Sequence, residues 1–196
     1  MTISKTIYFI RHGQALHNPD VDKFGKSILD NEKYADANLT ELGFSQCNSI
    51  KKDILDKNPD IVFVSPLTRT LQTANHLFKD SGINIVGLEM VRERYGWRPC
   101  DRRSGVDELK IKFPNISFEN CIPGLVDPIW KKGEENRETE KQIEIRITNF
   151  LEWIKLQPEK TIAIVTHQGF LIRLWNIIGK INPPPGNCEI RTLIIN

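Results

Sequence analysis

The sequence predicts an α/β fold: a three-layer α/β/α sandwich with a mostly parallel sheet at its centre and one further strand at a sheet edge. Short apolar runs alternate with longer amphipathic helical patterns, which is typical of a parallel sheet covered by helices. Several of these runs are continuously apolar, as expected for strands buried on both faces. A length of 196 residues, with 39% hydrophobic and 27% charged residues, indicates a single globular domain over residues 1–196.

The expected strands are short runs rich in β-branched and aromatic residues, each bounded by turn signals. They lie at residues 6–10, 61–64, 83–86 and 161–165, with a last edge strand at 189–195. Thr40 is expected to cap the first long helix, because a threonine side chain there accepts a hydrogen bond from the first turn. Further helices are expected at residues 67–78, 137–157 and 169–178.

Two long stretches lack a clean hydrophobic period. Residues 18–37 are polar and contain Pro19 and Gly25, so we expect a loop near the end of the first strand. Residues 89–135 contain four prolines. We expect this second stretch to form an irregular cap over the functional site, with a short helix near 106–111.

The composition excludes several classes of partner. The formal net charge of +2 is too small to indicate binding to nucleic acid or to a membrane surface. The amino terminus lacks the pattern of a signal peptide, and no apolar run approaches the roughly 18 residues of a membrane span. The four cysteines form no CxxC pair. We therefore expect free thiols, a cytoplasmic location and no metal ion, while the oligomeric state stays open, a homodimer included.

Three expected strands are followed by cationic or imidazole side chains. Arg11 and His12 follow the first strand, and Arg69 lies shortly after the second. His167 follows the fourth. Because the carboxyl ends of parallel strands meet at one sheet edge, these groups can converge on one pocket. Guanidinium groups, imidazoles and helix amino termini bind phosphoryl groups. The alternative for each residue alone is a structural or surface role, and we assign His17 to that class.

Five short motifs follow one another along most of the chain. They are Arg11-His12-Gly13 with Asn18, Leu39-Thr40-x-x-Gly43-x-x-Gln46, Ser65-Pro66-Leu67-x-Arg69-Thr70-x-Gln72-Thr73-Ala74, Arg92-Glu93-x-x-Gly96, and Thr166-His167-x-Gly169-Phe170. Each alone is weak, but in this order they resemble the histidine phosphatase superfamily, the phosphoglycerate mutase-like family. The resemblance implies the fold of that family and an enzyme that transfers phosphoryl groups.

By this resemblance, His12 is the nucleophile that accepts the phosphoryl group, and Glu93 donates a proton to the leaving oxygen. Arg11, Arg69 and His167 would hold the phosphoryl oxygens. The arginines are expected to lower the pKa of His12, so that a ring nitrogen stays unprotonated for attack. The residues expected to bind the rest of the substrate are Asn18, Gln14, Trp97, Gln168, Arg102 and Arg103.

The basic stretch after Glu93 bears on the substrate. Paired hydrogen bonds from Arg102 and Arg103 would bind a carboxylate or a second phosphate, as in phosphoserine or a phosphoglycerate. A sugar phosphate would instead stack on Trp97. The alternative is a surface turn whose charges are solvated.

Two departures from the mutases of the family favour a phosphatase. No proline run follows Ser104, and the sequence ends at Asn196, directly after the last expected strand. We therefore expect no tail to shield a phosphoenzyme from water. The prediction is a metal-independent phosphatase of small phosphorylated metabolites with no cofactor. The alternatives are a phosphoglycerate mutase, which would require 2,3-bisphosphoglycerate, and a non-catalytic phosphate-binding module.

Overall fold

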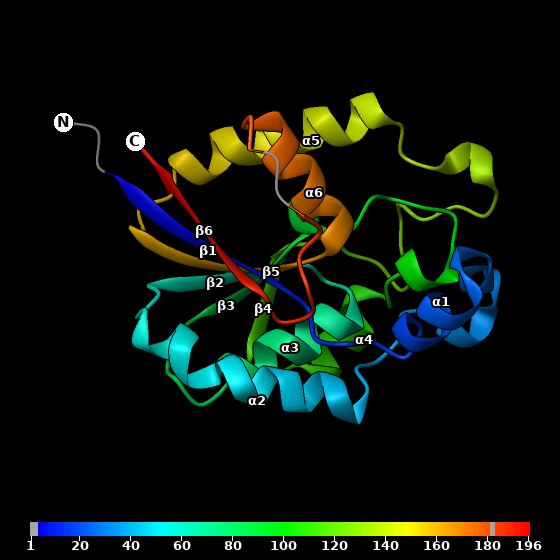
Figure 1. The fold of residues 1–196 in the computed structure, drawn as a ribbon, viewed down its shortest axis with the longest axis horizontal. Helices are drawn as coiled ribbons and strands as arrows, with labels where there is room; N and C mark the ends of the chain where they lie inside the picture. The colour runs from blue at the N-terminus through cyan, green and yellow to red at the C-terminus, as the bar shows by residue number, and fades with distance from the viewer. Residues whose placement is uncertain (1–3, 181–182) are drawn as a thin grey trace.

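The computed structural model describes residues 4–180 and 183–196 (Figure 1). Within these ranges six strands form one sheet, in the order β4-β3-β2-β5-β1-β6. The strands are β1 (Lys5–Arg11), β2 (Ile61–Val64), β3 (Ile85–Leu88), β4 (Ile116–Asn120), β5 (Thr161–Thr166) and β6 (Ile190–Ile195). β6 pairs antiparallel with β1, and the other pairs are parallel. The predicted edge strand near the end of the chain is confirmed as β6, and its antiparallel direction was not predicted.

Helices cover both faces of the sheet. They are α1 (Asn18–Phe24), α2 (Glu41–Asp56), α3 (Thr68–Phe78), α4 (Val106–Lys112), α5 (Glu140–Lys155) and α6 (Gln168–Ile177). In Figure 1, α5 and α6 lie on one side of the sheet, and α2, α3 and α4 lie on the other. Successive residues of β5 face opposite layers, since Ile162 and Ile164 belong to the core under α5 and α6, whereas Ala163 and Val165 belong to the core under α2 and α3. This alternation confirms the three-layer α/β/α sandwich.

The central strand order β2-β5-β1 brings three carboxyl ends together. Arg11 at the end of β1 is in register with Thr166 at the end of β5. Val64 at the end of β2 is in register with Val165. The residues that follow these three strands therefore lie at one edge of the sheet, as the sequence predicts.

Two helices begin at threonine caps. The Thr40 side chain accepts a hydrogen bond from the Gly43 N–H at 3.0 Å, which confirms Thr40 as the cap of α2. Thr139 forms a capping box with Gln142, so α5 begins at Glu140, slightly later than predicted.

The stretch predicted to be an irregular cap contains a strand of the sheet. β4 lies within residues 89–135 and pairs with β3. Only Ile116 and Phe118 of this strand are buried apolar residues, which is too short an alternation to stand out in the sequence. β3 also begins and ends two residues later than the run predicted at 83–86. The short helix predicted in the same stretch is confirmed as α4.

The loop predicted at residues 18–37 is wrong in its first part. This stretch contains α1 and two short 3₁₀ helices, one of them at Lys26–Asp30. Pro19 occupies the first turn of α1, where a missing N–H costs little. None of the α1 residues is buried, so the sequence contains no apolar period that would indicate a helix.

All four cysteines are buried free thiols, as predicted. In the part of the chain that the structure describes, no helix has both the length and the apolar composition needed to cross a membrane.

Candidate active site

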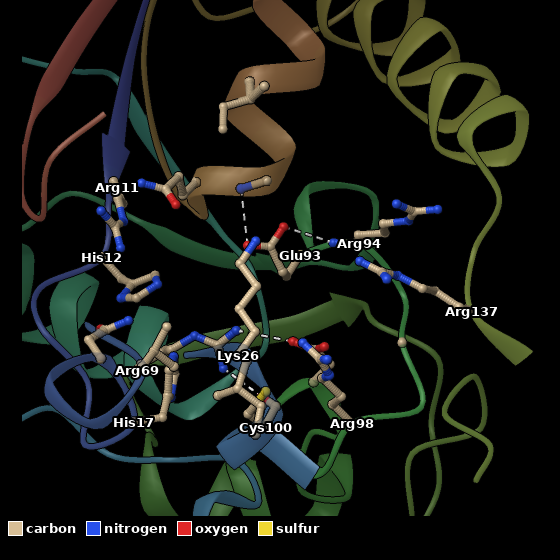
Figure 2. Close-up of a pocket in the computed structure, with 18 of the residues that line it drawn as sticks. Arg11, His12, His17, Lys26, Arg69, Glu93, Arg94, Arg98, Cys100 and Arg137 are labelled. Atoms are coloured by element: carbon tan, nitrogen blue, oxygen red, sulfur yellow. Dashed lines mark hydrogen bonds and ion pairs between the residues drawn. The ribbon is translucent and has the colours of Figure 1, made fainter. Parts of the chain in front are cut away.

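A pocket of about 330 Å³ opens at the carboxyl edge of the sheet. Its walls come from the end of β1, from α1 and the turn after it, from residues 93–101, and from the start of α6. Figure 2 shows histidine and arginine side chains around this space. The predicted site residues that line it are Arg11, His12, Asn18, Arg69, Glu93, Trp97 and Gln168.

His12 is fixed directly after β1. Its main-chain N–H donates to the Thr166 carbonyl at 3.0 Å, and its own carbonyl accepts from Asn187 Nδ2 at 3.0 Å. The ring Nδ1 lies 2.7 Å from the carbonyl oxygen of Gly13. Because a carbonyl oxygen only accepts, Nδ1 carries the proton and the neutral ring keeps its lone pair on Nε2. An imidazole in this tautomer can act as a nucleophile through Nε2.

The surroundings of His12 keep its ring neutral. The side chain is almost fully buried, and burial, followed by the charges of Arg69 and Arg11, lowers its pKa well below the ordinary value. The expected lowering of the His12 pKa is therefore confirmed. The same causes in the same order lower the pKa of His17, on the neighbouring wall, to about 3.

Two glycines bring helices against the loop that carries His12. A Cβ on Gly13 would lie 2.7 Å from the carbonyl oxygen of Gly43, and a Cβ on Gly43 would lie 2.3 Å from that of Gln14. The Gly13 N–H also donates to Thr73 Oγ1 on α3 at 3.2 Å. Glycine at both positions thus permits the backbone contact between this loop and α2.

Arg11 and Arg69 bring guanidinium groups to the pocket from β1 and α3. Each uses one terminal nitrogen to hold a main-chain carbonyl: Arg11 that of Pro185 at 2.8 Å, and Arg69 that of Cys100 at 2.7 Å. The Nε of each arginine is buried and has no hydrogen-bond partner among the described residues. Buried donors are nearly always paired, so both guanidinium groups have donors available to an anion.

His167 lies behind His12 and is fully buried. The two ring centroids are 5.2 Å apart, so the predicted pair of imidazoles does meet at one place. His167 Nε2 lies 2.7 Å from Ser65 Oγ, while its Nδ1 is buried without a partner in the described chain. His167 is not one of the residues that line the pocket, so the structure does not place this atom against a ligand, and the predicted contact of His167 with phosphoryl oxygens stays a prediction.

Glu93 is held at the amino terminus of α6. Its carboxylate accepts hydrogen bonds from the N–H groups of Gly169 and Phe170, both at 3.1 Å, and from that of Arg94 at 2.9 Å. A Cβ on Gly169 would lie 2.2 Å from Glu93 Oε1, so glycine is needed for this approach. The fourth and fifth motifs therefore form one contact, which fixes a carboxyl group in the pocket near His12 (Figure 2).

The residues predicted to bind the rest of the substrate divide into two groups. Asn18, Gln168 and Trp97 line the pocket. Gln14 does not, because its Oε1 accepts a hydrogen bond from Thr40 Oγ1 at 2.9 Å. The predicted place of Gln14 in the pocket is therefore wrong.

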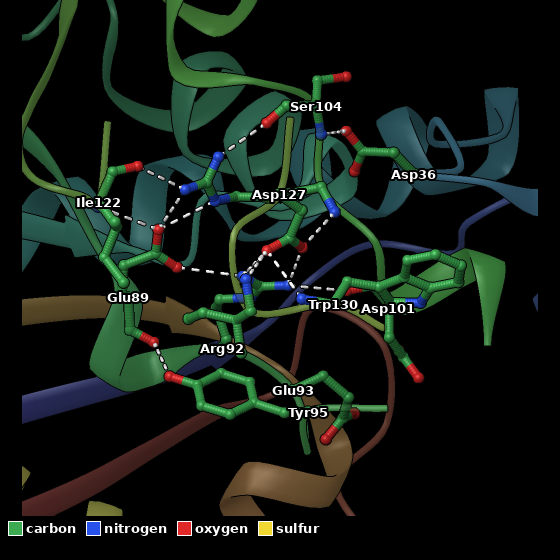
Figure 3. A network of polar contacts seen from close by, with 12 residues as sticks. Asp36, Glu89, Arg92, Glu93, Tyr95, Asp101, Ser104, Ile122, Asp127 and Trp130 are labelled. Atoms are coloured by element: carbon green, nitrogen blue, oxygen red, sulfur yellow. Dashed lines mark hydrogen bonds and ion pairs between the residues drawn. The ribbon is translucent and has the colours of Figure 1, made fainter. Parts of the chain in front are cut away.

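Arg102 and Arg103, predicted to bind a second anion, also lie outside the pocket. Arg103 is buried, and its Nε and Nη2 lie 2.9 and 2.7 Å from a Glu89 carboxylate oxygen (Figure 3). Arg102 forms an ion pair with Glu32 at 2.6 Å and lies 4.6 Å from the ring centroid of Trp130. This prediction is corrected because acidic residues distant in the sequence already neutralise both arginines.

Several titratable pocket residues were not predicted from the sequence. They are His17, Lys26, Arg94, Arg98, Asp101, Arg137 and Arg173. His17 was assigned a structural or surface role, yet its buried Nδ1 has no partner in the described chain. Its position directly before α1 is the signal that could have placed it here. Arg94 and Arg98 belong to the basic stretch after Glu93, whereas Lys26, Arg137 and Arg173 come from separate segments that no local motif marks.

The strand ends thus form a pocket lined by several arginines, with the neutral imidazole of His12 in its wall. Within residues 4–180 and 183–196, no group of three or more His, Cys, Asp or Glu side chains is arranged to hold a metal ion. The model of the histidine phosphatase superfamily (branch 1) matches residues 7–186. The chain belongs to this superfamily.

Other members of the superfamily are similar along most of their length. The chain is 33% identical to phosphoglycerate mutase-like protein 1 of Arabidopsis thaliana, over 97% of the chain and 81% of that protein. It is 31% identical to a probable phosphatase of Schizosaccharomyces pombe, over 91% of the chain and 80% of that protein. These relatives and the family support phosphatase activity.

Solved structures confirm the predicted fold class. A putative alpha-ribazole-5'-P phosphatase from Escherichia coli matches with a TM-score of 0.66 and 21% identity, over 98% of this chain and 91% of that chain. A phosphoglycerate mutase from Bacillus anthracis matches with a TM-score of 0.67 and 17% identity, over 99% and 89%. The fold is therefore that of the phosphoglycerate mutase-like proteins.

Proposed function

We propose that this protein is a metal-independent phosphatase that hydrolyses small phosphorylated metabolites through a phosphohistidine on His12. The observation that carries this proposal is the neutral His12 ring beside two arginines. The Gly13 carbonyl holds Nδ1, which leaves the lone pair on Nε2. Arg11 and Arg69 each have a donor without an acceptor in the described chain. Phosphoryl transfer depends mainly on positioning and charge neutralisation, and these residues can supply both.

In the first step, Nε2 of His12 attacks phosphorus and the bond to the substrate oxygen breaks. Arg11 and Arg69 stabilise the negative charge on the phosphoryl oxygens. Glu93, when protonated, gives its proton to the leaving oxygen, so that an alcohol leaves rather than an alkoxide.

In the second step, water attacks the phosphohistidine and the phosphorus–nitrogen bond breaks. The Glu93 carboxylate accepts the proton of the attacking water, and the electron pair returns to Nε2 of His12. The products are free phosphate and the neutral imidazole with which the cycle began.

The pocket favours a small substrate with a second negative group. Its volume of about 330 Å³ is at the lower end for ligand sites. Lys26, Arg98 and Arg137 line its outer part, in place of the two arginines first predicted for this task. Arg98 already forms an ion pair with Asp30 at 3.2 Å, whereas Lys26 and Arg137 have no ion-pair partner among the described residues. A phosphomonoester with a carboxylate, such as phosphoserine, would suit these cations, and a sugar phosphate would stack on Trp97.

The enzyme is tested with a chromogenic phosphate ester, with and without a chelator. Turnover should be insensitive to the chelator and should fall by roughly 10⁴-fold or more in His12→Ala, because the nucleophile is lost. His76 forms a hydrogen bond to Asn48 outside the pocket, so His76→Ala is the matched control and should retain activity. Intact-protein mass spectrometry after an alkaline quench should detect a phosphoenzyme in the wild type and none in His12→Ala.

Two outcomes would contradict this proposal. A folded wild-type protein without turnover on a panel of phosphorylated metabolites would indicate a phosphate-binding module. Loss of turnover with the chelator would reject metal independence.

Phosphoglycerate mutase is the second candidate, because relatives with mutase-like names align over nearly the whole chain. It would use 2,3-bisphosphoglycerate to phosphorylate His12. Measuring free phosphate against isomerised phosphoglycerate, with and without this cofactor, separates the two activities. A phosphatase releases phosphate in both conditions, whereas a mutase isomerises only when the cofactor is present.

A further inference from the structure

Asp101 is a pocket residue that the proposed mechanism does not use. Its carboxyl group lines the pocket at the end of a 3₁₀ turn, Pro99–Asp101. Asp101 Oδ1 lies 3.6 Å from Nη2 of Arg69, one of the two arginines that would hold the phosphoryl group, and the Asp101 side chain is 16% exposed. A carboxyl group therefore stands beside the proposed anion site.

The fold positions this carboxyl group through several contacts. A Cβ on Gly96 would lie 2.7 Å from Asp101 Oδ2, so glycine leaves the space that the carboxyl group occupies. The Asp101 main-chain carbonyl accepts from Arg92 Nη2 at 2.8 Å, and the carbonyl before it, that of Cys100, accepts from Arg69 at 2.7 Å. Figure 3 shows Asp101 at the border of this network, with its carboxyl group directed away from Asp127.

A charged carboxylate at this place opposes the binding of an anion. The groups that act on Asp101 are Arg69 on α3, Arg92 and Glu93 in the preceding segment, and the neighbouring Cys100. Burial, opposed by Arg69 and assisted by Glu93, raises the pKa of Asp101 to about 6. A phosphoryl dianion beside Arg69 would raise it further, because like charges at short range disfavour ionisation in a poorly solvated pocket.

We propose that Asp101 takes up one proton from solvent when a phosphoryl dianion binds, and then donates a hydrogen bond to a phosphoryl oxygen as a neutral carboxylic acid. This inference rests on the phosphate site of the proposed function. Only the O–H bond of Asp101 forms in this step, and Arg69 exchanges its carboxylate partner for the phosphoryl group. When phosphate leaves, Asp101 returns its proton to solvent. Anion affinity therefore decreases as pH rises above the pKa of the free carboxyl group.

The test uses sulfate as the probe, because this dianion does not itself titrate near neutral pH. Calorimetric titrations at pH 7, in two buffers with different ionisation enthalpies, give the number of protons taken up per sulfate. The wild type should take up close to one proton, and its affinity should fall by up to roughly tenfold between pH 7 and pH 8. His12→Asn should take up the same proton, since the imidazole is not its site.

Two substitutions of Asp101 separate its titration from its hydrogen bond. Asp101→Asn retains a donor but cannot titrate, so it should take up no proton, bind sulfate equally at both pH values, and bind at least roughly tenfold tighter than the wild type at pH 8. Asp101→Ala should also take up no proton and should bind severalfold more weakly than Asp101→Asn. Infrared difference spectra of the wild type should show a protonated carboxyl band on sulfate addition, a readout that needs no variant.

Three results would overturn this inference. The first is proton uptake that persists in Asp101→Asn, and the second is uptake that disappears in His12→Asn; either would place the proton on another group. The third is the absence of a protonated carboxyl band, which would mean that no carboxyl group is protonated. If wild-type protein binds no sulfate or phosphate at all, the anion site of the proposed function fails instead, so the two failures are distinguishable.

Discussion

Two groups of arginines with little solvent exposure lie in neighbouring parts of this molecule and have different surroundings. In the network of Figure 3, Arg92 donates to both carboxylate oxygens of Asp127, at 3.1 and 2.6 Å, and Arg103 pairs with Glu89. In the pocket of Figure 2, Arg11 and Arg69 hold main-chain carbonyls, at 2.8 and 2.7 Å, and neither has a carboxylate within 3.5 Å among the described residues. A buried Nε without a partner does not distinguish the groups, because Arg92 shares it.

Proton affinities follow this difference. Burial lowers the pKa of Arg11, and the charge of Arg69 adds to that effect against the opposing charge of Glu93. Burial would also lower the pKa of Arg92, but Asp127 and Glu89 more than offset it and raise the value above the ordinary one. Close carboxylate partners distinguish the arginines of the network from those of the pocket. The Arg92–Asp127 and Arg103–Glu89 pairs are 2.6 and 2.7 Å long. Arg69 lies 3.6 Å from Asp101, and Arg11 has no ion-pair partner among the described residues.

The largest expected effect is a loss of stability when an arginine of the ion-paired network is replaced. Arg92→Gln leaves the buried Asp127 carboxylate without its ion-pair partner, while Glu89 keeps Arg103, and breaking such a buried pair costs about 3–5 kcal/mol. Urea unfolding followed by circular dichroism measures this loss. A loss below about 1 kcal/mol would show that the network contributes little to stability. The structural role assigned to its arginines would then be wrong.

In the pocket, the expected effect is on catalysis. Arg69→Gln removes a cation from the proposed phosphoryl site, and kcat/KM should fall by about 10²–10³-fold. The free energy of unfolding should change by less than about 1.5 kcal/mol, because the main hydrogen bond lost is the one to the Cys100 carbonyl. Steady-state kinetics and urea unfolding on the same preparation check both values. A large stability loss with normal kinetics would place Arg69 in the structural group.

A smaller effect concerns the pKa of His12 itself. A positive charge beside an imidazole disfavours the imidazolium, so removing Arg69 should raise the His12 pKa toward its ordinary value. Protonation then begins at a higher pH, and the fraction of nucleophilic imidazole at pH 6 should decrease. Nuclear magnetic resonance titration of the ring in wild type and in Arg69→Gln measures this shift, with His12→Asn used to assign the signal. An unchanged pKa would mean that burial and Arg11 keep the ring neutral without help from Arg69.

The sequence predicted correctly those elements that have a clear signal within one short stretch of the chain. Buried strands followed by Arg11, His12 and His167 placed the pocket at the correct sheet edge, and Thr40 marked the start of α2. The missed elements lack such a signal: α1 buries none of its residues, and β4 has only a short alternation at an edge.

The same limit applies to the candidate site. Arg103 belongs to a network because Glu89 and Asp127 meet it from elsewhere in the chain, a contact that sequence spacing does not reveal. Asp101 lines the pocket because Gly96 leaves it room. Partners of this kind depend on how distant segments pack, so the sequence indicated a basic stretch without showing which charges were free.

The smallest expected effect comes from the pair of adjacent arginines first predicted to bind substrate. Arg102 and Glu32 have side chains that are 34% and 65% exposed, and exposed ion pairs contribute about 0–1 kcal/mol. Arg102→Gln should therefore change the free energy of unfolding by less than about 1.5 kcal/mol, including its contact with Trp130, and kcat/KM by less than about twofold. Arg103→Gln, one position away but buried against Glu89, is the matched control and should lose about 3 kcal/mol or more. Unfolding curves and kinetics of the two variants side by side make the measurement. If Arg102→Gln instead lowered kcat/KM tenfold without loss of stability, substrate would have to extend to this surface, and an acidic partner would no longer exclude an arginine from ligand binding.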